Sequence, residues 1–245
     1  QPINNFEVGL SRTMQLCGNH RPCGFDTWAR SIIGIWDLDN PGAVNEPGNQ
    51  LASIDFAYSF LLSGKSIRIS AEGTAEDEWK ILPYQYSRLI GSSITIPLGN
   101  GGGDLKVNVE LSDSGDVERW FYGRRYLGTM YNHSIYLTGH RYDDRTLGHS
   151  LDSGSKLASV KAEYTNSTGN SYGIIFSNAT INWDNTNLNI VSANSQNYSK
   201  IEIQTSQSFV LGDIKANLTY QTKAITLTQG VLPKIAANVS WRKKF

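Results

Sequence analysis

The side chains best suited to bind a ligand or to catalyse a reaction lie in four polar stretches of this 245-residue sequence, at 17–50, 76–87, 113–155 and 184–197. Aromatic rings there can cover the apolar faces of pyranose rings, and arginine and carboxylate groups can bind sugar hydroxyls and uronic acids. A histidine positioned by a carboxylate can instead act as a catalytic base. The candidates for ligand contact are Trp28, Arg30, Trp36, Glu76, Asp77, Glu78, Arg119, Tyr122, Arg124, His140, Arg141, Tyr142, His149 and Asp152.

The two cysteines, Cys17 and Cys23, lie close together in a segment rich in glycine, proline and polar residues. A disulfide between them fits an oxidising compartment such as the periplasm or the cell surface. Two free thiols are the alternative. A metal site is disfavoured, because His20 is the only nearby imidazole and a closed zinc site needs about four ligands. We predict the disulfide, and no metal or other cofactor.

The four polar stretches are separated by segments that have one apolar and one polar face, and these segments must hold the stretches in place. Near the end of the chain, Ile235, Ala237, Val239, Trp241 and Phe245 alternate with polar residues. Alternation with a period of two predicts strands with one apolar and one polar face. We find ten such segments, at 6–10, 54–60, 67–71, 90–98, 105–111, 158–164, 173–183, 201–211, 214–224 and 235–245.

The connections between these segments alternate in length. Short ones are predicted near 64–65, 99–104, 166–170 and 212–213, and the four polar stretches are the long ones. A short connection at 227–231 is the exception on the long side. Outer-membrane barrels have short periplasmic turns and longer outer loops, whereas a soluble β-sandwich, the alternative, has no reason to alternate in this way. We therefore predict one all-β domain over 1–245, a transmembrane antiparallel β-barrel of about ten strands with every long loop outside.

The composition of the chain argues against some classes of function. Lys+Arg and Asp+Glu both number 22, and this zero net charge disfavours a nucleic-acid partner. No window approaches 18 consecutive apolar residues, so a transmembrane helix is excluded. No signal peptide is visible, and we read the sequence as mature or trimmed. Charges of both signs fall on the polar faces, so neighbouring strands are expected to pair Lys with Glu across the wall, leaving a narrow or plugged lumen.

Six short segments resemble, in order, parts of the Wzi-like capsule-assembly proteins. They are 9–12 (GLSR), 47–52 (PGNQLA), 75–78 (AEDE), 133–136 (HSIY), 138–142 (TGHRY) and 147–152 (LGHSLD). The resemblance spans nearly the whole chain but corresponds only to the C-terminal part of that family. It implies a larger barrel of about eighteen strands, with a helical element near the periplasmic end and the first eight or so strands absent here.

That shortfall has a physical consequence. An open sheet in lipid leaves unpaired backbone groups that cost several kcal/mol each. Either ten strands close as a small barrel, or the remaining wall lies outside this sequence. We expect the second, and we doubt that the strand at 6–10 pairs with the strand ending at Phe245.

The resemblance implies a surface lectin that holds capsular or exopolysaccharide at the bacterial outer membrane. Its expected partners are that polymer and outer-membrane lipid, and the protein is expected to be monomeric unless the rest of the barrel is on another chain. The alternatives are a diffusion porin and a barrel hydrolase, a protease or phospholipase. The hydrolase could use His20, His133, His140 or His149, with Asp143, Asp144, Ser150 and Asp152 nearby. No spacing among these residues is diagnostic, and we predict that the protein is not an enzyme.

Overall fold

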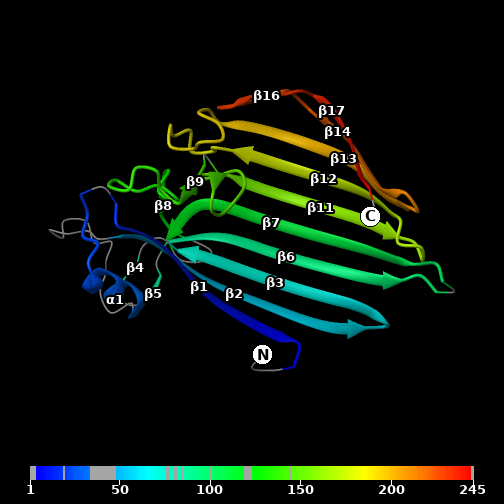
Figure 1. Ribbon diagram of the computed structural model, residues 1–245, viewed down its shortest axis with the longest axis horizontal. Helices are drawn as coiled ribbons and strands as arrows, with labels where there is room; N and C mark the ends of the chain where they lie inside the picture. Colours follow the sequence, from blue (N-terminus) through cyan, green and yellow to red (C-terminus); the bar gives the residue numbers. More distant parts are fainter. Residues whose placement is uncertain are drawn as a thin grey trace.

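The computed structural model describes residues 4–18, 20–33, 48–75, 78–79, 82–83, 85–99, 101–118, 123–143 and 145–243. Ten long antiparallel strands dominate it, each paired with the next long strand along the chain (Figure 1). The long strands are β1 (Phe6–Leu16), β2 (Gly48–Leu62), β3 (Lys65–Ala75), β6 (Gln85–Pro97), β7 (Asp104–Glu118), β11 (Lys156–Thr165), β12 (Ser171–Ile181), β13 (Gln196–Phe209), β14 (Gly212–Gln221) and β17 (Ile235–Lys243). Each predicted strand segment falls on one of them, in the predicted order.

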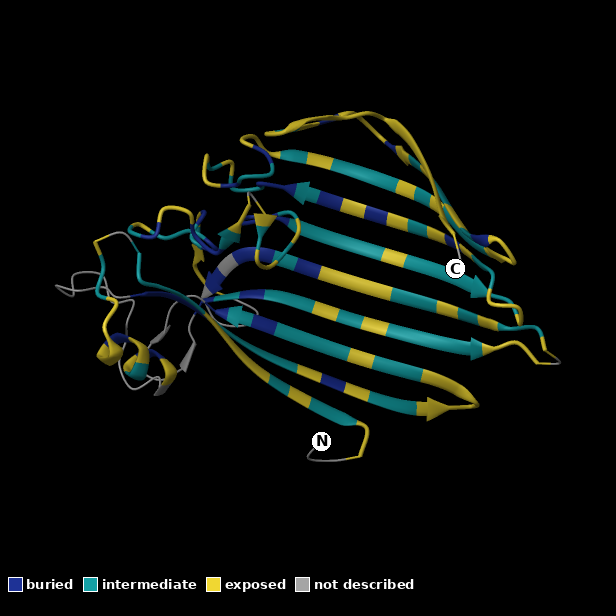
Figure 2. Cartoon of the chain, viewed as in Figure 1, coloured by how far each residue is buried: buried dark blue, intermediate teal, exposed yellow. Residues whose placement is uncertain are grey.

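Residue exposure alternates along these strands (Figure 2). We call outward the face that carries Leu10 on β1, Phe56 on β2 and Ile203 on β13, which are 78%, 36% and 56% exposed. Large apolar side chains on an exposed face are what a strand facing lipid requires. The inner face carries polar residues such as Glu163 and Gln204, which line a cavity bounded by several strands. The two-faced strands predicted from the sequence are confirmed.

Turns of two to six residues join the strands at one end of the sheet, at 63–64, 98–103, 166–170 and 210–211. Ser63 and Gly64 both have positive φ, 50° and 75°, the two-residue turn that matches the twist of paired strands. All longer connections lie at the opposite end (Figure 1). The strands extend into the predicted loops, so that β2 already begins at Gly48 and β7 continues to Glu118.

The prediction of a short connection at 227–231 is wrong. Residues 222–234 form a long connection with its own hairpin, β15 (Ile225–Leu227) and β16 (Gly230–Leu232). The chain leaves β14 at Gln221, whose side-chain amide donates to the carbonyl oxygens of Leu232 and Pro233. Every connection at this end of the sheet is therefore a long one, and the alternation of connection lengths has no exception.

The sheet does not close. Among the described residues, β1 and β17 each pair along one side only and form its opposite edges. A closed ten-stranded barrel is therefore not what this chain forms by itself, and β1 is not the partner of the last strand. Phe245 lies outside the described residues.

Short elements occupy the long-loop end. They are α1 (Phe25–Ile33), β4 (Glu78–Trp79), β5 (Leu82–Pro83), β8 (Arg125–Tyr126), β9 (Arg141–Tyr142) and β10 (Arg145–Thr146). β8 pairs with β7 as an eleventh strand of the large sheet. The predicted disulfide between Cys17 and Cys23 is present and precedes α1. Over the described part of the chain, no helix combines the length and the hydropathy that crossing a membrane requires.

Candidate functional site

Two long loops fold together at the long-loop end, and we call residues 123–143, 145–155 and 182–195 the loop cap. Its centre is the fully buried carboxylate of Asp152. That carboxylate accepts hydrogen bonds from Nη2 of Arg141 at 2.9 Å, Oγ1 of Thr146 at 2.8 Å and the backbone N–H of Ile190 at 2.8 Å. One side chain therefore joins both loops.

A second group of buried polar residues holds the two loops of the loop cap together. The side-chain amide of Asn189 donates to the carbonyl oxygen of Leu151 at 3.0 Å. Asn182, at the end of β12, donates from its backbone to Oγ of Ser155 at 3.2 Å and from its side chain to Ser192 at 2.9 Å. Buried polar groups that find partners give a loop a defined conformation. The loop cap therefore has a defined conformation.

The structure brings Arg141 and Asp152 together, as a buried ion pair with 8% and 0% side-chain exposure. Their polar atoms bind the loops: Nη1 of Arg141 also donates to the carbonyl oxygens of Tyr131 and Thr138 at 3.3 Å. A ligand on the surface cannot reach the Asp152 carboxylate. The geometry gives this pair a positioning role, and polysaccharide contact by either residue stays a prediction.

Two of the candidate histidines lie inside the loop cap. Nδ1 of His149 accepts a hydrogen bond from the backbone of Leu151 at 3.2 Å, and Nε2 lies 2.7 Å from Oγ of Ser112. Burial lowers the pKa of His149. His140 is fully buried, neither of its ring nitrogens has a hydrogen-bonding partner among the described residues, and burial lowers its pKa to about 4. Both imidazoles are therefore neutral at neutral pH.

A cavity of about 350 Å³ lies between the loop cap and the inner face, and we call it the cap cavity. Hydroxyl groups of the first strands line one side, and Tyr131, Leu147 and His149 of the loop cap line the other. Glu72 contributes a carboxylate, and Arg88 a guanidinium that pairs with Asp113 at 3.1 Å. The lining residues that sequence reasoning missed are Ser11, Thr13, Leu51, Ser53, Glu72, Thr74, Ser87, Arg88, Leu89, Ser114, Tyr131, Leu147 and Gly148.

The other candidates are dispersed. Trp28 and Arg30 lie on α1, Tyr142 is 77% exposed on β9, and the guanidinium of Arg124 lies 5.3 Å from the ring centre of Tyr126. Trp36, Glu76, Asp77, Arg119 and Tyr122 lie outside the described residues, and of Glu78 only the backbone position in β4 is described. The structure therefore brings six candidates into the loop cap: His140, Arg141, His149 and Asp152 in its interior, and Arg124 and Tyr142 on its exposed side.

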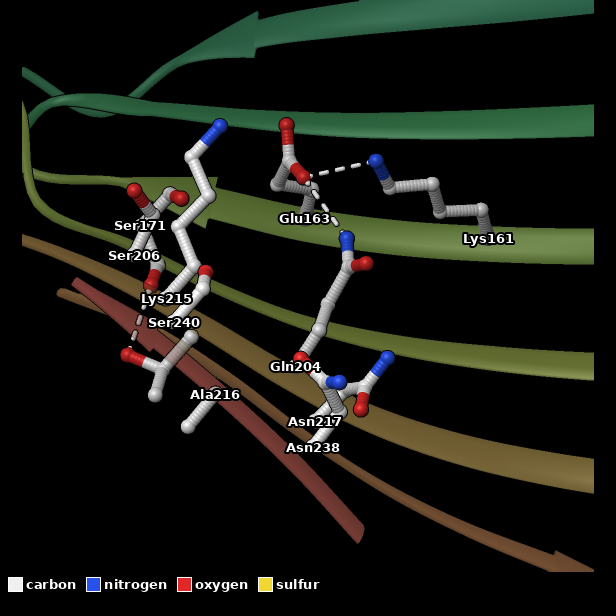
Figure 3. A pocket seen from close by; sticks show the side chains of 11 residues that line it. Lys161, Glu163, Ser171, Gln204, Ser206, Lys215, Ala216, Asn217, Asn238 and Ser240 are labelled. Carbon is white, nitrogen blue, oxygen red and sulfur yellow. Dashed lines mark hydrogen bonds and ion pairs between the residues drawn. The ribbon is translucent and has the colours of Figure 1, made fainter. Parts of the chain in front are cut away.

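A second cavity, of about 490 Å³, lies on the inner face toward the short turns (Figure 3). In it, Lys161 pairs with Glu163 at 2.7 Å, and the amide of Gln204 donates to Glu163 at 3.0 Å. The expected pairing of Lys with Glu across neighbouring strands is wrong for the pairs seen here. Lys161 and Glu163, like Lys200 and Glu202, are two residues apart on one strand, because alternate residues share a face.

A family model described as capsule assembly protein Wzi matches residues 1–231. The chain is 37% identical over 83 residues to an uncharacterized 55.8 kDa protein in the cps region of Klebsiella pneumoniae, covering 34% of this chain and 16% of that protein.

A solved structure has a similar fold, with a TM-score of 0.74 at 22% identity, covering 98% of this chain and 48% of that one. It is described as Wzi, an outer membrane protein involved in group 1 capsule assembly in Escherichia coli and a carbohydrate-binding β-barrel. The chain spans about half the length of that structure.

Proposed function

This chain belongs to the capsule assembly protein Wzi family, and on that premise we propose that it is part of the wall of an outer-membrane β-barrel that holds capsular or exopolysaccharide at the bacterial surface. The match of the family model over residues 1–231 is the observation that carries the proposal. The similar structure from Escherichia coli, itself described as carbohydrate-binding, supports it.

The outward face supports a membrane location. Leu10, Phe56 and Ile203 lie on it and are exposed, although burying a side chain of this size is worth about 1.5–3 kcal/mol in water. In a bilayer these side chains contact hydrocarbon instead of water, so their exposure does not carry that free-energy cost. The concentration of longer connections at one end of the sheet matches the outer loops of such barrels.

The cap cavity supports carbohydrate binding. Serine and threonine hydroxyls of β1, β2 and β3 can exchange hydrogen bonds with sugar hydroxyls, and the carboxylate of Glu72 can accept them. Leu51 and Leu147 offer apolar contact to the ring faces of a sugar. The cavity volume lies in the range of small-molecule sites, about 300–1,000 Å³. We place one sugar unit of the polymer here.

Exposed groups of the loop cap extend the proposed surface outward. The ring of Tyr142 is available to cover a pyranose face, and Arg124, stacked on Tyr126, presents a cation to acidic sugars. His149 contributes to the cap cavity, whereas His140, Arg141 and Asp152 hold the loop cap in shape.

We propose binding without hydrolysis. A serine nucleophile needs a histidine that accepts its proton. Nδ1 of His149 already accepts the Leu151 N–H, so the neutral ring carries its proton on Nε2 and donates to Ser112. That orientation is opposite to the one that activates a nucleophile.

Deleting the gene in its own strain tests the proposal. Cells without the protein are expected to release surface polymer into the medium, and the wild-type gene should restore attachment. An unchanged ratio of attached to released polymer would contradict the proposal. Intact polymer length after incubation with the purified protein separates binding from hydrolysis.

A further inference from the structure

The helix α1 has its amphipathic pattern inverted relative to a helix on a water-facing surface. Thr27 and Ser31 are buried, with 6% and 0% exposure, whereas Phe25, Trp28 and Ile32 are 89%, 48% and 73% exposed. Spacings of three and four residues place these three apolar side chains on one helical face. A surface helix in water normally buries that face and exposes the polar one.

The polar side of α1 is seated on the outward face of the sheet. Nη1 of Arg12 donates to the backbone carbonyl of Ser31 at 3.1 Å, and Nη2 donates to the side chain of Gln50. Arg12 alternates in phase with Leu10 on β1, so both side chains leave the same face of the strand. On β2, Gln50 is in phase with Phe56, which is also outward.

Along this face, apolar residues are therefore replaced by polar residues toward the long-loop end. Leu10 is exposed on β1. Arg12 lies two residues nearer the long-loop end and donates to the helix backbone, and Gln50, level with Met14, is buried. The exposed apolar side of the helix then faces away from the sheet. The helix thus contacts the polar part of the wall and continues its apolar surface.

We infer that α1 is an interfacial anchor that inserts Phe25, Trp28 and Ile32 into the lipid of the outer leaflet, around the rim of the barrel. The inference rests on the proposed membrane location. Aromatic residues and arginines gather where hydrocarbon meets headgroups, and the Asp26–Arg30 pair at 2.8 Å places charge beside this apolar face. The Cys17–Cys23 disulfide shortens the tether between β1 and the helix.

Spin labels measure which solvent reaches each position. Both cysteines of this chain form the disulfide in the native protein. Each introduced cysteine therefore adds a single site that a spin label can modify. The variants are Ile32→Cys and Phe25→Cys on the helix, Leu10→Cys on the outward face, and Leu137→Cys in the loop cap, where the side chain is 83% exposed. Each is reconstituted in vesicles of phosphatidylethanolamine and phosphatidylglycerol.

Oxygen partitions into lipid, whereas a charged nickel chelate stays in water. Labels at Ile32, Phe25 and Leu10 should relax faster with oxygen, and the label at Leu137 faster with the nickel chelate. A label at Ile32 should also be shallower than the one at Leu10, because the helix lies nearer the long-loop end.

The outcomes separate the two claims. If the Leu10 label also responds to nickel, the membrane location itself is wrong. If Leu10 is in lipid but Ile32 and Phe25 respond to nickel, α1 is not an anchor and the membrane location stands. If neither reagent reaches Ile32, a protein segment covers the helix and the inference is overturned in favour of that partner.

Discussion

Nη2 of Arg141 lies 3.0 and 2.9 Å from the two carboxylate oxygens of Asp152, in a pair that the solvent barely reaches. Asp152 also binds the second loop through the backbone of Ile190. The shape of the loop cap therefore depends on this buried contact between Arg141 and Asp152.

Replacing Asp152 with Ala should destabilise the loop cap by about 3–5 kcal/mol, because it leaves the buried guanidinium of Arg141 without its counter-charge. Hydrogen exchange of backbone amides in residues 145–155 and 182–195 measures the effect locally. Asp143→Asn is the matched control, since Asp143 is exposed and should change exchange by less than about 0.5 kcal/mol. Equal protection in both variants would contradict the role of Asp152.

Acidification should loosen the same loops. Burial lowers the pKa of His140 from 6.5 to about 4, so below pH 6.5 the unfolded chain binds a proton that the folded one refuses. The stabilisation that neutral His140 contributes is complete above pH 6.5 and decreases as the pH falls toward 4, by about 2.5 kcal/mol at pH 4.5. Hydrogen exchange in the loop cap at pH 7 and 4.5, corrected for intrinsic rates, measures the decrease.

The variant His140→Phe should flatten much of that pH dependence, because phenylalanine cannot take up a proton. His149, whose pKa is also lowered by burial, should account for a smaller remainder. A wild-type loop cap equally protected at both pH values would show that neither buried imidazole is linked to its stability.

Loss of the Glu72 carboxylate should weaken polysaccharide binding without disturbing the fold. A hydrogen bond to a charged group is worth about 1.5–3 kcal/mol, so Glu72→Ala should raise the dissociation constant roughly 10- to 100-fold. Surface plasmon resonance with the strain's own polymer measures it. Glu110→Ala removes an inner-face carboxylate outside the cap cavity and should leave affinity unchanged. Equal losses in the two variants would point to general charge effects.

The exposed aromatic ring of Tyr142 should contribute less binding free energy than the cap cavity. Tyr142→Ala removes an exposed aromatic face worth about 0.5–1.5 kcal/mol in a stacked contact, and affinity should fall roughly 2- to 12-fold. Leu127→Ala is the control, because that side chain is also an exposed apolar group of the loop cap. Wild-type affinity in Tyr142→Ala would exclude the ring from the binding surface.

The sheet could be predicted from the sequence because each strand repeats a two-residue pattern imposed by two different environments. Leu105 and Val107 oppose Lys106 on β7 in the way that Ile201 and Ile203 oppose Glu202 on β13. The pattern weakens beyond the apolar band, and for this reason the strand ends at Gly48 and Glu118 were missed. The short connection at 227–231 was predicted wrongly, because residues 222–234 contain a small hairpin of their own, β15 and β16.

The loop cap could not be predicted in the same way. The bond from Ile190 to Asp152 joins residues 38 positions apart, and neither loop has a periodicity that encodes it. Residue chemistry selected Arg141 and Asp152 as exposed ligand contacts, whereas burial turns them toward each other. The cap cavity was missed because serine and threonine are common, and only the fold shows which of them face the same space.

We propose that this protein binds the capsular or extracellular polysaccharide of its own bacterium in the cap cavity, between the loop cap and the inner face of the sheet. The most direct test is a binding isotherm of that purified polymer on the immobilised, folded protein, with the Glu72→Ala and Glu110→Ala variants in parallel. Saturable binding that Glu72→Ala weakens and Glu110→Ala preserves is the predicted result. Absence of saturable binding by the folded wild-type protein would contradict the account.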